Sequence, residues 1–150
     1  MVQEYKVLVY DNRTEWFNME GQKHRLDGPA VECSDGTKSW WVNGQLHRVD
    51  GPAIQWSDGY KSWWVNGLLH RADGPAVEWS NGSKEWWVNG LLHRLDGPAI
   101  EWSNGSKEWW IKDIQYSEEE FNGKVNPIQE LTVEEISQRL GYEVKVIKGE

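Results

Sequence analysis

A His-Arg-x-Asp tetrad is the pattern in this sequence most suited to chemistry, and it occurs four times. The tetrads begin at His24, His47, His70 and His93. An arginine presents a planar fork of donors to a phosphate or carboxylate, which makes Arg48, Arg71 and Arg94 candidate ligands for an anion. The alternative is structural: the arginine pairs with the aspartate, and the histidine bonds to the backbone at a turn. The structural role is favoured, because catalysis needs one site and the tetrad recurs in every unit.

Other catalytic chemistries lack their residues. In a kinase catalytic loop the aspartate directly follows the arginine, whereas here one residue intervenes, and no Asp-Phe-Gly follows. One histidine and one aspartate per unit are too few ligands for a metal, and the chain has a single cysteine, Cys33. No nucleophile elbow, P-loop or His-Glu-x-x-His is present. The sequence therefore predicts no enzymatic activity, no metal and no cofactor.

Adjacent tryptophans form the second recurring pattern. Neighbouring residues of a strand point to opposite faces, so one tryptophan of each pair cannot share a core with the other. The second members form a row of Trp41, Trp64, Trp87 and Trp110. This row either covers the sheet by stacking on itself, or offers a platform for bases, sugars or the anchor residues of a partner protein. Both roles stay open, and the row and the three arginines are the candidate binding residues.

Both patterns recur every 23 residues, in units 21–43, 44–66, 67–89 and 90–112. A fixed period of this length is typical of a repeat architecture. Within one unit, residues 53–57 alternate in polarity, Asp58-Gly59 indicates a hairpin turn, and residues 60–65 return. Asn66-Gly67 indicates a second turn. The sequence predicts a mainly β fold of repeated hairpins.

A two-residue turn at Asp58-Gly59 would pair Ile54 with Trp63 and Trp56 with Lys61. The candidate core face then carries Ile54, Trp56, Trp63 and Val65, and the other face carries Ala53, Gln55, Ser62 and Trp64. Cys33 replaces Trp56 in its unit and is interpreted as a core residue. A one-residue shift of register would exchange these assignments.

The two ends depart from the repeat. Residues 1–20 are predicted to be a degenerate half-repeat that caps the array, with Phe17 matching Trp40. Residues 113–150 are predicted to form a small α/β tail. A capping box at Ser117 opens one helix, Thr132 opens a second that reaches about Leu140, and residues 142–147 alternate like a strand.

The segment Trp64-Val65-Asn66-Gly67-Leu68-Leu69-His70, with its 23-residue period, resembles MORN repeats and their bacterial variants over residues 21–112. The form His-Arg-x-Asp-Gly-Pro-Ala is similar to repeat proteins of tailed phages and large DNA viruses. The resemblance implies a single-layer solenoid of β-hairpins that binds partners and has no catalytic centre.

Composition limits the partners. The chain has 150 residues, 16 basic and 24 acidic, with a net charge of −8, which argues against non-specific binding of nucleic acid. No apolar run is long enough to span a membrane, and no secretory signal is recognisable. A single cysteine suits a reducing compartment, so we expect a cytoplasmic protein, in the host cell if it is viral. A homo-oligomer is compatible with the sequence.

The leading prediction is a non-enzymatic repeat protein, a phage accessory or counter-defence protein that binds or sequesters a host protein. The alternative is a sponge that holds an aromatic anion, such as a nucleotide second messenger, with the tryptophan row and the arginine row. An acidic DNA mimic is less favoured, because the four units are nearly neutral.

Overall fold

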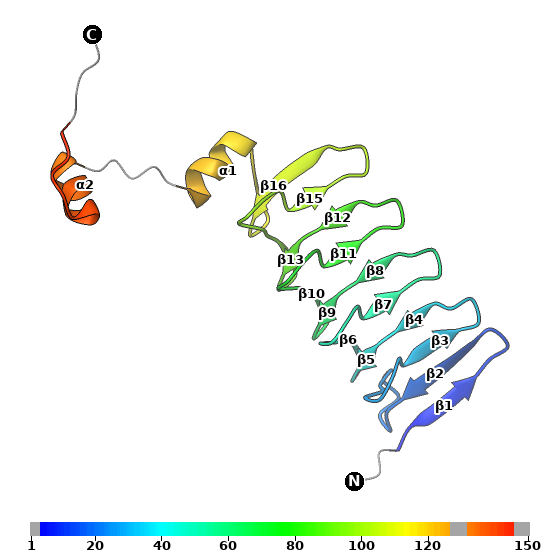
Figure 1. Ribbon diagram of the computed structural model, residues 1–150. Helices are drawn as coiled ribbons and strands as arrows, with labels where there is room; N and C mark the ends of the chain where they lie inside the picture. Colours follow the sequence, from blue (N-terminus) through cyan, green and yellow to red (C-terminus); the bar gives the residue numbers. More distant parts are fainter. Residues whose placement is uncertain (1–3, 127–131, 146–150) are drawn as a thin grey trace.

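The chain is mainly β in the computed structural model, which describes residues 4–126 and 132–145. Figure 1 shows β-hairpins standing side by side in a row, with the N-terminal strands at one end and the helix α1 at the other. Eleven strands form one antiparallel sheet, in the order β1-β2-β3-β4-β7-β8-β11-β12-β15-β16-β17. The hairpins recur every 23 residues, as the sequence predicts.

The sheet strands are short, with two residues each in the central units. Their bounds are β1 Lys6–Val9, β2 Arg13–Phe17, β3 Val31–Cys33, β4 Lys38–Ser39, β7 Ile54–Gln55, β8 Lys61–Ser62, β11 Val77–Glu78, β12 Lys84–Glu85, β15 Ile100–Glu101, β16 Lys107–Ile111 and β17 Ile114–Tyr116.

A second series of hairpins follows the edge of this sheet. These are β5 Trp41–Val42 with β6 Gln45–Leu46, β9 Trp64–Val65 with β10 Leu68–Leu69, and β13 Trp87–Val88 with β14 Leu91–Leu92. The turn between β9 and β10 has positive φ at both central residues, 51° at Asn66 and 76° at Gly67. Asparagine and glycine tolerate this left-handed backbone, which explains the recurring Asn-Gly pair.

The hairpin loop between β7 and β8 contains three residues, Ser57 to Gly59. Ile54 lies opposite Ser62, and the Trp56 amide donates to the Tyr60 carbonyl at 2.9 Å. Gly59 supplies the left-handed position of this loop, with φ of 98°. The predicted pairing of Ile54 with Trp63 is therefore wrong by one residue, because a three-residue loop replaces the expected two-residue turn.

This register exchanges the two tryptophans between the faces. Trp64 lies on the face of Ser62, to which its indole N–H donates at 2.8 Å. That face, which we call the aromatic face, carries Ile54, Trp56, Ser62 and Trp64 and their counterparts in the other units. The opposite face, which we call the arginine face, carries Ala53, Gln55, Lys61 and Trp63 and their counterparts.

Small side chains are the most deeply buried in the array. Ala30, Ala53, Ala76, Ala99 and Ser62 are fully buried, followed by Ser83 and Val77. Trp56 is 50% exposed, so its predicted place in a core is wrong. Cys33 is half-buried at the same position of its unit and is not a core residue either.

The hairpin of β1 and β2 extends the sheet at the N-terminal end. The Trp16 amide donates to the Ala30 carbonyl at 2.9 Å, just as the Trp40 amide donates to that of Ala53. Trp16, and not Phe17, therefore corresponds to Trp40. The predicted match is wrong because the β1–β2 turn is one residue shorter than its counterparts.

Two helices follow the array, both beginning where the sequence predicts. α1 (Glu118–Val125) has a capping box at Ser117 and buries Phe121, and it packs on β16 and β17. α2 (Val133–Leu140) has a capping box at Thr132 and ends at Gly141, whose φ is 74°. Residues 142–145 form no strand, and the rest of the strand predicted over 142–147 lies outside the described residues. Within the described ranges, neither helix is long and apolar enough to cross a membrane.

Candidate binding surfaces

Each tetrad arginine is held flat between a tryptophan ring and a glycine. The Arg48 Cζ lies 4.0 Å above the Trp40 ring. On the other side, a Cβ atom placed on Gly51 would lie 3.0 Å from the same Cζ, so only glycine leaves room for the guanidinium. The contact recurs with Arg25 on Trp16, Arg71 on Trp63 and Arg94 on Trp86, at 4.0 to 4.2 Å.

The polar atoms of these arginines already have partners. Arg48 Nε donates to Asp50 Oδ1 at 2.8 Å, and its Nη1 donates to the Pro52 carbonyl at 3.3 Å. The hydrogen bond and positive charge of the arginine lower the pKa of Asp50 below its usual value, and the pKa values of Asp73 and Asp96 are lowered in the same way.

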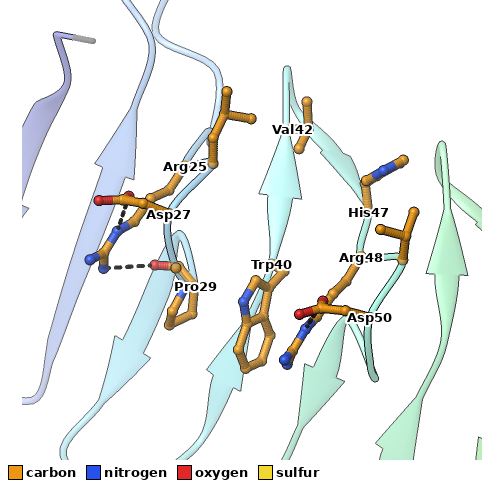
Figure 2. Close-up of a pocket in the computed structure, with 11 residues that line it drawn as sticks. Arg25, Asp27, Pro29, Trp40, Val42, His47, Arg48 and Asp50 are labelled. Carbon is orange, nitrogen blue, oxygen red and sulfur yellow. Dashed lines mark hydrogen bonds and ion pairs between the residues drawn. The ribbon is translucent and has the colours of Figure 1, made fainter. Parts of the chain in front are cut away.

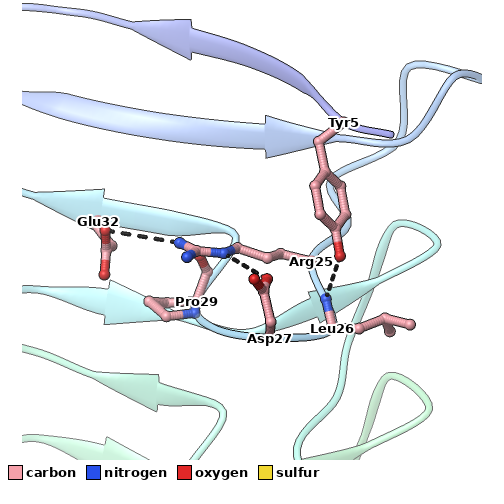
Figure 3. A network of polar contacts seen from close by, with 6 residues as sticks. All are labelled: Tyr5, Arg25, Leu26, Asp27, Pro29 and Glu32. Carbon is pink, nitrogen blue, oxygen red and sulfur yellow. Dashed lines mark hydrogen bonds and ion pairs between the residues drawn. The ribbon is translucent and has the colours of Figure 1, made fainter. Parts of the chain in front are cut away.

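Figure 3 shows this arrangement at Arg25, which reaches Asp27, the Pro29 carbonyl and Glu32. The Leu26 amide beside it donates to the Tyr5 hydroxyl at 3.1 Å, which ties the N-terminal segment to the first loop. The arginine side chains are only 20–23% exposed. The arginines that the sequence proposes as anion ligands thus hold the loops of their own units.

Each tetrad histidine bonds to the backbone of the preceding unit and to the backbone of its own unit. The His70 amide donates to the Trp63 carbonyl at 3.0 Å, and the His70 Nδ1 accepts the amide N–H of Asn89 at 3.2 Å. The same side-chain bond links His24 to Asn43, His47 to Asn66 and His93 to Lys112. The arginine–aspartate pairs and these histidine bonds are the contacts that the structural interpretation of the tetrad predicts.

Three similar hollows lie between successive tetrad loops, with volumes of about 590, 570 and 560 Å³. Figure 2 shows the first, in which Arg25, Asp27, Arg48 and Asp50 flank the Trp40 ring. Each arginine stands beside its own aspartate, so the hollow offers no excess of positive charge to an anion. Within the described ranges, no three His, Cys, Asp or Glu side chains gather as metal ligands.

The predicted tryptophan row is half-buried and bonded. Trp41 and Trp64 donate their indole N–H groups to Ser39 and Ser62, at 2.7 and 2.8 Å. Trp87 and Trp110 donate to Glu85 and Glu108, at 2.8 and 3.0 Å. The row lies on the aromatic face, whereas Arg48, Arg71 and Arg94 stack on the arginine face. The structure therefore does not bring the two predicted sets together.

A second tryptophan row, which sequence reasoning placed in the core, is the more exposed one. Trp56, Trp79 and Trp102 are 50%, 41% and 39% exposed. The Trp79 indole donates to Oε1 of Glu85 at 2.7 Å, while Trp87 occupies Oε2 of the same carboxylate. Glu108 joins Trp102 to Trp110 in the same way. The alternation of residues 53–57 did place Trp56 on one face of its strand. It could not show that this face is exposed, because the assignment of faces also depends on the length of the hairpin loop.

Tyr60 fills the space between two of these exposed rings. Its ring centroid lies 4.6 Å from that of Trp56 and 5.1 Å from that of Trp79. We call Trp56, Tyr60, Trp79 and Trp102 the aromatic strip. Because its residues come from successive hairpins of the sheet, the strip runs across the strands.

Comparisons of the chain with protein-family models, with curated proteins and with solved structures find no match.

Proposed function

We propose that this chain is a non-enzymatic binding protein, built as an open solenoid of MORN-like hairpin repeats, whose aromatic face binds a partner protein. The observation that carries the proposal is the exposure of Trp56, Trp79 and Trp102, between 39% and 50%, in one row. Tryptophan and tyrosine dominate the hot spots of protein interfaces, where burial of their large rings releases water from apolar surface. A row of such rings on one face is typical of an interaction surface.

The solenoid part of the proposal is supported by the bonds between units. The Trp40 amide donates to the Ala53 carbonyl at 2.8 Å, and the Gly44 amide donates to the Lys23 carbonyl at 2.9 Å. Equivalent bonds recur at each later junction, so every unit is bonded to its neighbour in one way. The resemblance of the His-Arg-x-Asp-Gly-Pro-Ala loops to repeats of phages and large DNA viruses makes a host protein the partner we propose, met in the host cytoplasm.

A protein partner is favoured over a nucleotide because the arginine donors are engaged and face away from the aromatic strip. A DNA mimic is disfavoured by the arginine face, where lysines alternate with carboxylates. Lys84, for example, lies between Glu78 and Glu101 on the neighbouring strands.

The test is affinity capture of partners from a bacterial lysate, identified by mass spectrometry. The variant replaces Trp56, Trp79 and Trp102 by serine. Its matched control replaces Leu26, Val49 and Leu95, three exposed apolar residues of the tetrad loops, also by serine. We expect the wild type and the control to capture the same protein and the aromatic variant to lose it. Equal capture by all three, or no specific capture by any, would overturn the proposal.

A further inference from the structure

The aromatic strip has a defined repeat distance. Each unit contributes two strands to the sheet, so equivalent residues of successive units stand two strand spacings apart, about 9.5 Å. The centroid distances of 4.6 and 5.1 Å on either side of Tyr60 agree with this spacing between Trp56 and Trp79. From Trp56 to Trp102 the strip therefore spans about 19 Å.

Few peptide conformations present a side chain at this interval. A polyproline II helix repeats every three residues, or about 9.3 Å, so six residues cover about 19 Å. An α-helix brings a residue back to the same face every heptad, about 10.5 Å, and is out of step by about 2 Å after two repeats. An extended strand returns to one face every about 6.8 Å. The strip fits the polyproline II period most closely.

The negative charge of the aromatic face further restricts the kind of ligand that it can bind. Glu85 and Glu108 hold the tryptophan rows together by accepting the indole N–H groups, and Glu108 also accepts the Gln115 amide. Within the described residues, no Lys or Arg forms an ion pair with either carboxylate. Such carboxylates attract a cationic side chain and repel the phosphates of nucleic acid.

The Trp56 indole offers a hydrogen-bond donor to the ligand backbone. In the unit of Trp56, Ser62 takes the place of the bridging glutamate, and the Trp56 indole N–H donates to no atom of the described residues. A polyproline II segment has no internal hydrogen bonds, so its carbonyls are free to accept such an N–H.

From the spacing, the charge and this donor, we infer that the partner recognised by the aromatic strip is a proline-rich segment in the polyproline II conformation, flanked by a basic residue. This inference rests on the proposed function and names the chemistry of its partner. Successive turns of the segment lie on Trp56, Trp79 and Trp102, and the basic residue lies near Glu85 or Glu108. Aromatic rings receive such a segment well because it is rigid before it binds.

The test uses the full chain and its tryptophan fluorescence. The probe is a nonaproline peptide ending in Arg-Arg, and its control is a Gly-Ser peptide of equal length with the same ending. We expect saturable binding of the proline probe, with affinity at least about tenfold higher than that of the control peptide. Replacement of Trp56 by alanine should weaken binding by about tenfold or more, whereas Val49→Ser should leave it unchanged.

We expect the Trp56→Ala variant to fold, because Trp56 is half exposed and its indole makes no hydrogen bond within the described residues. If circular dichroism reports that it is unfolded, Trp56→Phe, which keeps a ring but removes the N–H, replaces it, with a weakening of several-fold expected. Equal affinity for the two peptides, or no binding of the proline probe, would overturn the inference. The proposed function would survive that result if lysate capture still depends on Trp56, Trp79 and Trp102.

Discussion

The same arginine–tryptophan contact recurs at Arg25, Arg48, Arg71 and Arg94, always at 4.0 to 4.2 Å. A guanidinium over an aromatic face contributes about 0.5–2 kcal/mol, depending on how much water is excluded. Here the glycine of the loop covers the other side, and the Nη1 group satisfies a proline carbonyl. One side chain thus joins the loop, the ring and an aspartate.

We expect Arg71→Ala to lower the free energy of unfolding by about 1–3 kcal/mol, because the Trp63 ring loses its cover and the Pro75 carbonyl loses its donor. Chemical denaturation followed by tryptophan fluorescence measures the change. Lys61→Ala, which removes an exposed cation from the same face, should change stability by less than about 0.5 kcal/mol. Equal effects of the two variants would mean that the stacked arrangement contributes nothing beyond its charge.

At the same scale, the sequence predicted the pairing of arginine with aspartate and missed the stacking on tryptophan. The pairing joins residues two apart in one loop, such as Arg48 and Asp50. The stacking joins Arg48 to Trp40 across the short hairpin of β5 and β6, and it depends on how that hairpin folds back. The tetrad pattern therefore predicts contacts between residues close in sequence, but not contacts that depend on how the chain folds back.

At the scale of the element, the three-residue hairpin loop, such as Ser57 to Gly59 between β7 and β8, decides which side chains of the two strands face solvent. The sequence identified the turns at Asp58-Gly59 and Asn66-Gly67 and both helix starts, because each has a local chemical signature. Asp-Gly suits both a two-residue and a three-residue loop, since glycine provides the positive φ in either case. The sequence therefore left the loop length open by one residue, and both the strand register and the exposure of Trp56 depend on that length.

The tetrad loop gives a prediction at the scale of the element. A Cβ on Gly74 would meet the Arg71 Cζ at 3.0 Å, so Gly74→Ala must displace the guanidinium from Trp63. We expect a loss of about 1–2 kcal/mol by denaturant titration, reduced in part by the lower entropy of the unfolded chain.

Gly123 in α1 is the matched control, because nothing lies within 4 Å of a Cβ placed there. Gly123→Ala should stabilise the protein by about 0.5–1 kcal/mol, as alanine favours the helix. A neutral or stabilising effect of Gly74→Ala would show that the loop does not clamp the arginine.

At the scale of the whole molecule, stability is distributed over junctions that are nearly copies of one another. The Trp86 amide bonds to the Ala99 carbonyl at 2.8 Å and the Gly90 amide to the Leu69 carbonyl at 2.9 Å, as their counterparts do one unit earlier. In such an array each unit contacts only its neighbours, so stability is approximately a sum over units and junctions. The ends differ from the units, with the β1–β2 hairpin at one and α1 at the other.

Removal of one complete unit should therefore leave a folded protein. Deletion of residues 67–89 joins Asn66 to Gly90 and recreates the same turn, while His93 takes the place of His70 at the Trp63 carbonyl. We expect the β circular dichroism signal per residue to persist and the free energy of unfolding to fall by about 1–3 kcal/mol, the share of 23 residues in a typical domain. The control deletes residues 67–78, which is about half a unit of similar sequence. This deletion removes β11, the partner of β12 in the sheet, so we expect the chain to unfold. If both deletions unfold the chain equally, the units are not independent and the stability lies in contacts beyond nearest neighbours.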